Sequence, residues 1–267
     1  MLRSLFTGIS GLRAHQQMLD VTSNNIANVN TVGYKSSSAV FQDTLSQTLT
    51  GAGLGTATTG GTNPEQIGLG VQLGGTVTNF LQGSNQYTGR SSDLLINGDG
   101  FFVLSNNGQQ TFSRAGSFSL DAVGHLVSPD GSIVQSAAGG NLDLSALNSG
   151  TYTSWSISPT GDVNAVDAAG ATTTIGTIAT ATFPNPGGLT RIGNSQYVTS
   201  VNSGAAAIGA AGSGGRGKLT AGYLEMSNVD LGSELTNLII SERGFQANSR
   251  VITTSDEVLQ SLISMKN

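Results

Sequence analysis

Both ends of the chain carry a heptad pattern of apolar residues, and the residues between the ends follow other patterns. Near the N-terminus, apolar side chains recur in steps of four and three residues, as in a helix that packs against another helix. These positions are Leu5, Ile9, Leu12, Leu19 and Ile26. Only Gln16 and Ser23 place polar side chains in the rhythm. The pattern ends before Gly33, which we expect to stop the helix.

A longer pattern of the same kind begins at Leu231. Seven of its ten heptad positions are apolar, namely Leu231, Leu235, Leu238, Phe245, Ile252, Leu259 and Ile263. Asp230 is the expected N-cap, and Glu234 close behind it suits the positive end of the helix dipole. Because no proline occurs between Leu231 and Met265, we expect one continuous helix.

The central region has the signals of β-structure. Phe101–Ser105 and Gln109–Arg114 flank the turn Asn106-Asn107-Gly108, whose Asn-Gly pair is typical of a tight β-hairpin. We expect this hairpin to form part of an antiparallel meander over 94–135. Further strands are expected at 152–157, 162–166 and 172–183.

These patterns predict an α+β fold. The N- and C-terminal helices would pair as a coiled-coil-like inner domain, with an extended linker and a mainly antiparallel β domain between them. The long segments of Gly, Ser, Thr and Ala on either side of the strands are expected to be extended or flexible. The expected divisions are 1–33 for the N-terminal helix, 34–92 for the extended connector, 93–201 for the β-rich outer domain, 202–227 for a linker and 228–267 for the C-terminal helix.

Neither terminal helix can bury its apolar stripe inside a distant β domain. The simplest arrangement is that the two helices pair with each other, and the rest of each stripe then faces other subunits. Composition agrees with self-association, because only 10% of the residues are charged and 38 are glycine. Such a surface repels copies of itself only weakly.

Composition also excludes several classes of function. The net charge of −5 gives no reason to expect a nucleic acid partner, and the absence of cysteine excludes thiolate metal sites and cysteine nucleophiles. No apolar run reaches the length of about 18 residues that a membrane-spanning helix needs, so we expect no membrane insertion. The first residues lack the pattern of a cleaved secretory signal.

We expect no catalytic, cofactor or metal site, and therefore no enzyme. The two histidines, His15 and His125, have no Gly-x-Ser-x-Gly motif to support a hydrolytic triad. No Gly-Lys-Ser/Thr tripeptide marks a phosphate-binding loop, and the Asp-Gly pairs lack the clustered carboxylates of a calcium loop. Turn formation accounts for those pairs.

Several motifs resemble those of the bacterial flagellar rod and hook protein family. The N-terminal motif runs from Asn24 to Lys35, and Ser10-Gly11-Leu12 precedes it. The motif of the β domain combines Gly98–Phe102 with Phe112–Phe118. The closing motifs are Gly222–Leu231 and Arg243–Arg250. Residues 136–216 match the family poorly.

The resemblance implies that both terminal helices form the inner tube of an axial homopolymer, with the β domain outside it. Residues 36–92 would connect neighbouring subunits. It also implies export by the flagellar type III apparatus without a cleaved signal, and a place in the extracellular flagellum. The implied partners are a flagellar rod protein, the hook–filament junction protein and the hook cap. The expected assembly interface comprises the apolar heptad positions above together with Asn24, Asn25 and Asn28, whose amides can satisfy helix ends and neighbouring backbones.

Within the family, the sequence favours a short hook protein, a flexible tube that transmits torque from rod to filament. The run Thr253–Leu259 after Gln246–Arg250 looks most like hook proteins. The length of the chain instead suits a distal rod protein, a stiff drive shaft, and the segment 46–74 is longer than in some hook proteins. A β-rich surface adhesin with accidental terminal heptads is the alternative from another class.

Overall fold

The computed structural model describes residues 2–56, 60–148 and 152–265. The chain forms two compact units. The first unit, here called the helical unit, comprises Met1–Ala27, Ser37–Thr78 and Asp230–Asn267. The second, the β unit, comprises Asn28–Ser36 and Asn79–Val229. With terminal helices and mainly antiparallel sheets between them, the chain has the α+β class that the sequence predicted.

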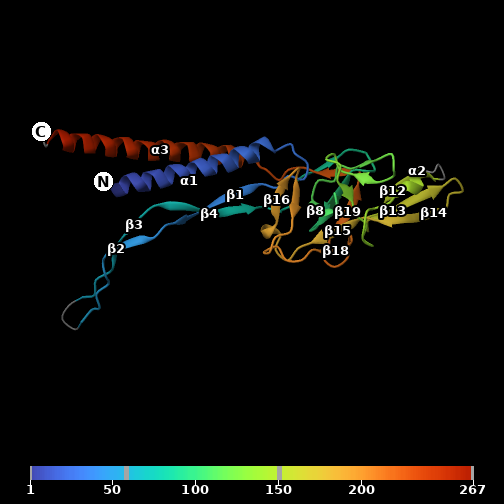
Figure 1. Ribbon diagram of the computed structural model, residues 1–267, viewed down its shortest axis with the longest axis horizontal. Helices are drawn as coiled ribbons and strands as arrows, with labels where there is room; N and C mark the ends of the chain where they lie inside the picture. Colours follow the sequence, from blue (N-terminus) through green and yellow to red (C-terminus); the bar gives the residue numbers. More distant parts are fainter. Residues whose placement is uncertain (1, 57–59, 149–151, 266–267) are drawn as a thin grey trace. The chain divides into compact units, whose positions relative to one another are not determined.

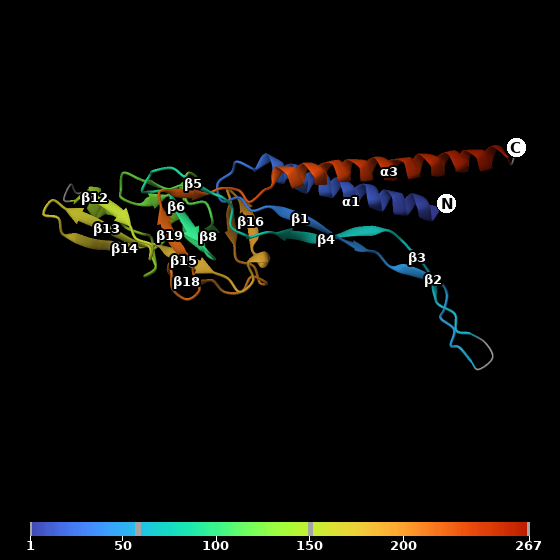
Figure 2. The same ribbon diagram turned by 180° about the vertical axis from the view of Figure 1, so that it is seen from behind.

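The helical unit contains two long helices and a two-stranded ribbon. Helix α1 (Leu2–Ala27) lies beside α3 (Leu231–Ser264), as Figures 1 and 2 both show. Strand β1 (Ser37–Asp43) pairs with β4 (Val71–Thr78), and α1 contacts both strands. The ribbon continues as β2 (Ser46–Thr50) paired with β3 (Glu65–Gly68), which leads away from the helices (Figure 1).

The helix ends agree only partly with expectation. Asp230 caps α3 as predicted, since its Oδ1 accepts a hydrogen bond from the Gly232 N–H at 2.9 Å. Helix α1 ends at Ala27, so the prediction that Gly33 stops it is wrong. Gly33 has a φ of +67° and lies in the β unit, where an added Cβ would sit 2.4 Å from the Ala115 nitrogen. This close backbone approach, rather than a helix end, requires glycine there.

The β unit is built around a nine-stranded antiparallel sheet. Its main path runs β16-β17-β8-β7-β11-β10-β9, and β15 pairs with both β7 and β18. The strands are β7 (Phe101–Asn106), β8 (Gln109–Ser113), β9 (Ser119–Leu120), β10 (Leu126–Val127), β11 (Ile133–Val134), β15 (Ala179–Thr182), β16 (Thr190–Gly193), β17 (Gln196–Val198) and β18 (Ala207–Ala210). The predicted hairpin is confirmed, and Asn107 and Gly108 both have positive φ at its turn, as a type I′ turn requires.

Smaller elements complete the β unit. A three-stranded sheet contains β12 (Tyr152–Ile157), β13 (Asp162–Asp167) and β14 (Thr172–Thr177). The first two lie close to their predicted bounds, but the single strand expected at 172–183 is divided into β14 and β15, which belong to different sheets. Two further antiparallel pairs join β6 (Leu94–Asn97) to β19 (Lys218–Ala221) and β5 (Asn85–Tyr87) to β20 (Tyr223–Glu225). The short helices are α2 (Ser145–Asn148) and the 3-10 helix η1 (Pro186–Gly188).

Strand β7 separates two hydrophobic clusters. Phe102 and Leu104 belong to the larger one, and Phe101 and Val103 belong to the other. Because successive side chains of a strand point to opposite faces, one strand supplies both clusters. This explains why Phe101-Phe102-Val103-Leu104 is an unbroken apolar run rather than an alternating one.

The structure corrects two of the expected divisions. The linker expected at 202–227 contains β18, β19 and β20, each paired in a sheet. The backbone N–H and C=O groups of a Gly- and Ala-rich segment form strand hydrogen bonds as readily as those of other residues, if a neighbouring strand has free partners. The connector expected at 34–92 is also divided, because 37–78 belongs to the helical unit and 79–92 to the β unit. Most backbone hydrogen bonds of this connector join its own strands, β1 to β4 and β2 to β3.

Candidate assembly surface

The two helices meet along a seam of small and polar residues. The buried positions of α1 are Gly8, Gly11, Ala14, Thr22 and Asn25. A Cβ added to Gly8 would lie 3.3 Å from Ile252 Cγ1, and one added to Gly11 would lie 2.8 Å from the Asn248 amide. On α3, a Cβ added to Gly244 would lie 2.4 Å from His15 Cε1. The glycines therefore allow the helix backbones to approach closely.

The contacts define an antiparallel register. Along α1 they fall at Ser4, Gly8, Gly11, His15 and Asn25, and the matching residues of α3 are Ser255, Ile252, Asn248, Gly244 and Glu234. Each advance along α1 is matched by a nearly equal step backward along α3. At the end of the seam formed by the C-terminus of α1, the Asn25 amide donates to Glu234 Oε1 at 2.9 Å and to the Ser37 carbonyl at 2.7 Å.

On α1, the predicted apolar heptad lies one residue beyond this seam, whereas Ile252 of the α3 heptad contacts the seam at Gly8. Leu5, Ile9, Leu12 and Ile26 directly follow the seam residues Ser4, Gly8, Gly11 and Asn25. One residue turns about 100° around a helix, so these side chains flank the seam instead of filling it. Leu5, Leu12, Leu19 and Ile26 are half-buried, and Ile9 is 38% exposed. The structure therefore corrects which residues pair the helices, and the expected coiled-coil packing is not confirmed.

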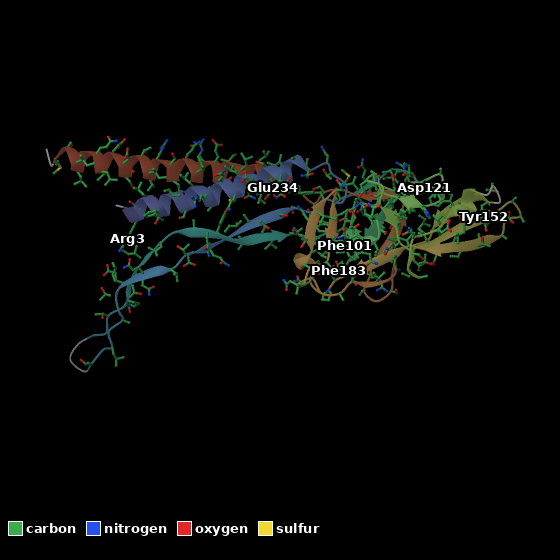
Figure 3. All side chains as sticks on the ribbon, viewed as in Figure 1. Arg3, Phe101, Asp121, Tyr152, Phe183 and Glu234 are labelled. Carbon is green, nitrogen blue, oxygen red and sulfur yellow. The ribbon has the colours of Figure 1, made fainter. Side chains whose placement is uncertain are left out.

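Helix α3 leaves even more apolar surface uncovered within the chain. Among its predicted positions, Leu231, Leu235, Phe245 and Ile263 are exposed, and Leu238, Ile252 and Leu259 are half-buried. Further exposed apolar residues on this helix are Ile239, Ile240, Val251, Val258 and Leu262. Side chains stand off α3 along its whole length in Figure 3. Phe6 on α1 is 67% exposed. Large side chains at this density on one pair of helices indicate a surface that other molecules cover.

The three asparagines occupy different environments. Asn25 is buried and uses both ends of its amide inside its own chain, since its Oδ1 accepts from the Ser37 N–H at 3.0 Å. We therefore remove Asn25 from the expected interface. Asn28 lies just beyond α1 and its side-chain oxygen accepts from the Thr31 hydroxyl at 3.0 Å, which stabilises the turn after the helix. Asn24 is exposed on α1.

The sequence pattern missed the seam because periodicity counts favour large apolar residues. A usable signal was present: small residues recur at Ser4, Gly8, Gly11 and Thr22, in the same rhythm as the leucines and one position earlier.

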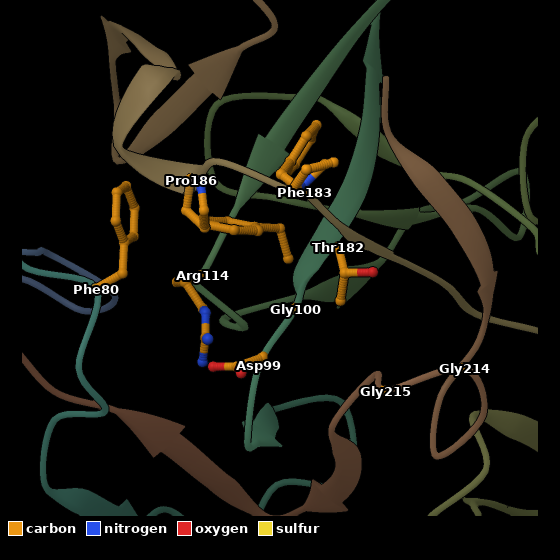
Figure 4. Close-up of a pocket in the computed structure, with 11 residues that line it drawn as sticks. Phe80, Asp99, Gly100, Arg114, Thr182, Phe183, Pro186, Gly214 and Gly215 are labelled. Carbon is orange, nitrogen blue, oxygen red and sulfur yellow. The ribbon is translucent and has the colours of Figure 1, made fainter. Parts of the chain in front are cut away.

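A pocket of about 430 Å³ opens in the β unit (Figure 4). Phe80, Phe101, Phe183 and Pro186 form apolar walls, and Arg114 and Asp99 lie at one end. Arg114 Nη1 donates to Glu225 Oε2 at 3.2 Å, so an internal carboxylate holds its guanidinium. No histidine or serine lines the pocket, and no group of three potential metal ligands gathers anywhere in the described residues. The described helices include none long and apolar enough to cross a membrane.

Three family descriptions match successive parts of the chain. "Flagella basal body rod protein" matches residues 5–35, "Flagellar hook protein FlgE/F/G D1 domain" matches 95–165 and "Flagellar basal body rod FlgEFG protein C-terminal" matches 220–265. The flagellar basal-body rod protein FlgG of Bacillus subtilis is 48% identical over 267 residues and covers both chains completely. The chain belongs to the flagellar rod and hook protein family.

Other members of the rod and hook family show the same full-length similarity. The rod protein FlgG of Caulobacter vibrioides is 38% identical over 270 residues, with complete coverage of both chains. The flagellar hook protein FlgE of Borreliella burgdorferi is 28% identical over 442 aligned residues, again with complete coverage. The chain is therefore a structural subunit of the flagellar axis and not an enzyme.

Proposed function

We propose that the chain is a rod subunit of the flagellar basal body, and specifically a distal rod protein that forms a stiff drive shaft. The proposal is supported by the lengths of the alignments with the relatives, taken together with the sequence identities. The relatives named rod protein align over 267 and 270 residues at 48% and 38% identity. The alignment with the hook protein extends over 442 positions, and the 267 residues here leave at least 175 of them without a counterpart.

This proposal replaces the hook assignment that the sequence favoured. The C-terminal motifs on which that assignment rested fall inside 220–265, a region whose family description covers rod and hook proteins together. Motifs shared by both cannot distinguish them. Because the hook assignment is replaced, we no longer propose the hook–filament junction protein and the hook cap as direct partners.

Polymerisation would use the apolar surface beside the helix seam. On this proposal, neighbouring copies cover the exposed and half-buried positions Leu5, Ile9, Leu12, Leu19, Ile26, Leu231, Leu235, Leu238, Phe245, Ile252, Leu259 and Ile263. Complete burial of one large apolar side chain contributes about 1.5–3 kcal/mol, so a few of them per contact can hold copies together. The chain would reach the flagellar axis unfolded, through the type III apparatus.

The ribbon β2–β3 supports the choice of a stiff tube. Every residue of both strands is exposed. Leu45 and Leu54, which lie just before and after β2, are 84% and 94% exposed. An isolated two-stranded ribbon is marginal in water, which favours a role against neighbouring copies. Such a connection between subunits would resist bending.

Electron microscopy of basal bodies from a strain that lacks this gene tests the proposal. We expect truncated rods. Complete rods that end without a hook would instead restore the hook assignment, and intact flagella would contradict an essential axial role. Complementation with the wild-type gene controls for effects on neighbouring genes.

A further inference from the structure

The chain passes between its two units four times, after Ala27, Ser36, Thr78 and Val229. The β unit is therefore attached through three stretches of its own chain, which lie far apart in sequence. These attachment segments are 33–36, 79–84 and 225–228. Tyr34 and Phe80 bury apolar surface in the first two segments, and polar contacts within the β unit connect all three segments.

Glu225 contacts two of these segments and Arg114, the residue that directly follows β8. Its Oε1 accepts hydrogen bonds from Lys35 Nζ at 2.5 Å and from the Gly83 N–H at 2.9 Å. Its Oε2 accepts from Arg114 Nη1 at 3.2 Å. Its main-chain oxygen accepts from the Gly33 N–H at 2.8 Å. One residue thereby joins the first attachment segment, the second and the sheet.

The charges of this group are removed from water. Lys35 and Glu225 are completely buried, and Arg114 is 3% exposed. Lys35 Nζ also donates to the Leu81 carbonyl at 2.7 Å, so two partners compensate its burial. Burial lowers the pKa of Lys35, and the neighbouring Glu225 carboxylate opposes that shift. Removal of one member would leave its partners charged, buried and unpaired, which is strongly unfavourable.

Asn228 continues the same set of contacts. Its Oδ1 accepts from the Ser36 N–H at 2.8 Å, and its Nδ2 donates to the carbonyls of Asn79 at 2.9 Å and Leu81 at 3.1 Å. The Asn79 N–H donates directly to the Ser36 carbonyl at 2.8 Å. All three attachment segments are thus connected by directional hydrogen bonds, with Glu225 and Asn228 supplied by the last one.

We propose that Glu225, with Lys35 and Asn228, forms a clamp that fixes the attachment segments of the β unit to one another. Hydrophobic contacts alone would allow these short segments to slide, whereas a buried carboxylate with three donors specifies one register. Since Lys35 and Glu225 are 190 residues apart, the N-terminal attachment becomes fixed only when the C-terminal one has joined it. The proposal concerns the fold of the single chain and is independent of the rod assignment.

Amide hydrogen exchange of the purified full-length chain tests the clamp. We expect Glu225→Gln to increase exchange at Gly33, Ser36, Asn79 and Gly83 by about tenfold to a hundredfold, the loss expected for hydrogen bonds to a charged group. Exchange in β13 should change much less. Asp143→Asn, which neutralises an exposed carboxylate of the same unit that accepts from the Ser145 N–H, is the control and should leave all these amides unchanged. Equal increases throughout the β unit, or an increase at Gly83 alone, would overturn the proposal.

A second variant separates the clamp from the penalty of unpaired charge. The triple variant Lys35→Met, Arg114→Met, Glu225→Leu replaces the whole group by apolar side chains of similar size. We expect its Tm to return to within about 5 °C of the wild type, while Asn79 and Gly83 still exchange at least about tenfold faster. Wild-type protection in this variant would show that burial alone holds the segments, and it would overturn the proposal even if Glu225→Gln does not fold.

Discussion

At the scale of single residues, Gly244 and His15 determine how closely α1 and α3 approach. A Cβ added at position 244 would lie only 2.4 Å from Cε1 of the His15 imidazole. We expect Gly244→Ala to destabilise the helix pair by about 1–2 kcal/mol, because overpacking outweighs the better helix propensity of alanine. Thermal unfolding of the full chain, followed by circular dichroism of the helices, measures the effect.

Two further variants make this prediction specific. Gly232→Ala should be neutral or slightly stabilising, since the nearest atom to its added Cβ is Asp230 Oδ1 at 3.5 Å. Adding His15→Ala to Gly244→Ala should recover most of the lost stability, because the clash then disappears. If Gly244→Ala melts like Gly232→Ala, His15 does not fill the seam as described.

We expect Asp162 to make the stability of the β unit depend on pH in the acid range. Hydrogen bonds from the Thr177 hydroxyl at 2.6 Å and the Thr160 hydroxyl at 2.7 Å lower the pKa of this carboxyl below its ordinary 3.8. A lowered folded-state pKa means that the stabilisation is complete above pH 3.8 and is lost as the pH falls through the folded value. We expect Asp162→Asn to reduce the unfolding free energy by about 1 kcal/mol at pH 6.

The same difference should shrink toward zero as the pH falls from 3.8 through the lowered folded-state pKa of Asp162. Chemical denaturation at several pH values measures it, and Asp99→Asn supplies a control with an exposed carboxylate. Solvent screens Asp162 in part, which keeps the expected effect small. A difference that is constant from pH 2 to pH 6 would contradict the proposed link to ionisation.

At the scale of elements, the exposed apolar residues of α3 allow an effect on assembly to be measured separately from an effect on folding. Leu235 is exposed within the chain, so Leu235→Ser should change the stability of the β unit and of the unassembled chain by less than about 0.5 kcal/mol. If neighbouring copies bury Leu235, the loss of about 2 kcal/mol per contact raises the critical concentration for polymerisation by roughly tenfold or more. Sedimentation of polymers measures it. Thr236→Ser, at an adjacent exposed position, should polymerise like the wild type.

The sequence predicted those elements whose signals are local. The hairpin at Asn107-Gly108, strands β12 and β13 and both terminal helices follow from turn residues and periodicity. The single strand expected at 172–183 is divided between two sheets, as β14 and β15. The seam did not follow, because glycine and serine add almost nothing to a hydrophobic pattern. Strand β18 lacks alternation and is recognised only from its pairing with β15. The contact between Lys35 and Glu225 joins residues 190 apart, which no local pattern can relate.

At the scale of the whole molecule, the two units differ in how much of their apolar surface is buried within the single chain. The β unit buries two hydrophobic clusters and a charged network inside itself. The helical unit packs on glycines and polar groups and leaves the large apolar side chains of its heptads half-buried or exposed. The β unit is thus complete within the single chain, and the helical unit is not. On the proposed function, further copies of the chain cover the apolar surface of the helical unit.

The ribbon β2–β3 gives the final prediction. Leu45 and Leu69 already face each other across it, because the Leu69 N–H donates to the Leu45 carbonyl at 3.2 Å. Replacing residues 46–68 by Asn-Gly should therefore close β1 and β4 with a type I′ turn and leave the Tm of the chain unchanged. If the ribbon connects copies, polymers of this variant will bend more easily, and their curvature in electron micrographs will exceed that of the wild type. Replacing only 56–60 by an equal length of Gly and Ser is the matched control and should keep the wild-type curvature. Unchanged curvature in the shortened variant would place the stiffness of the tube in its helices instead.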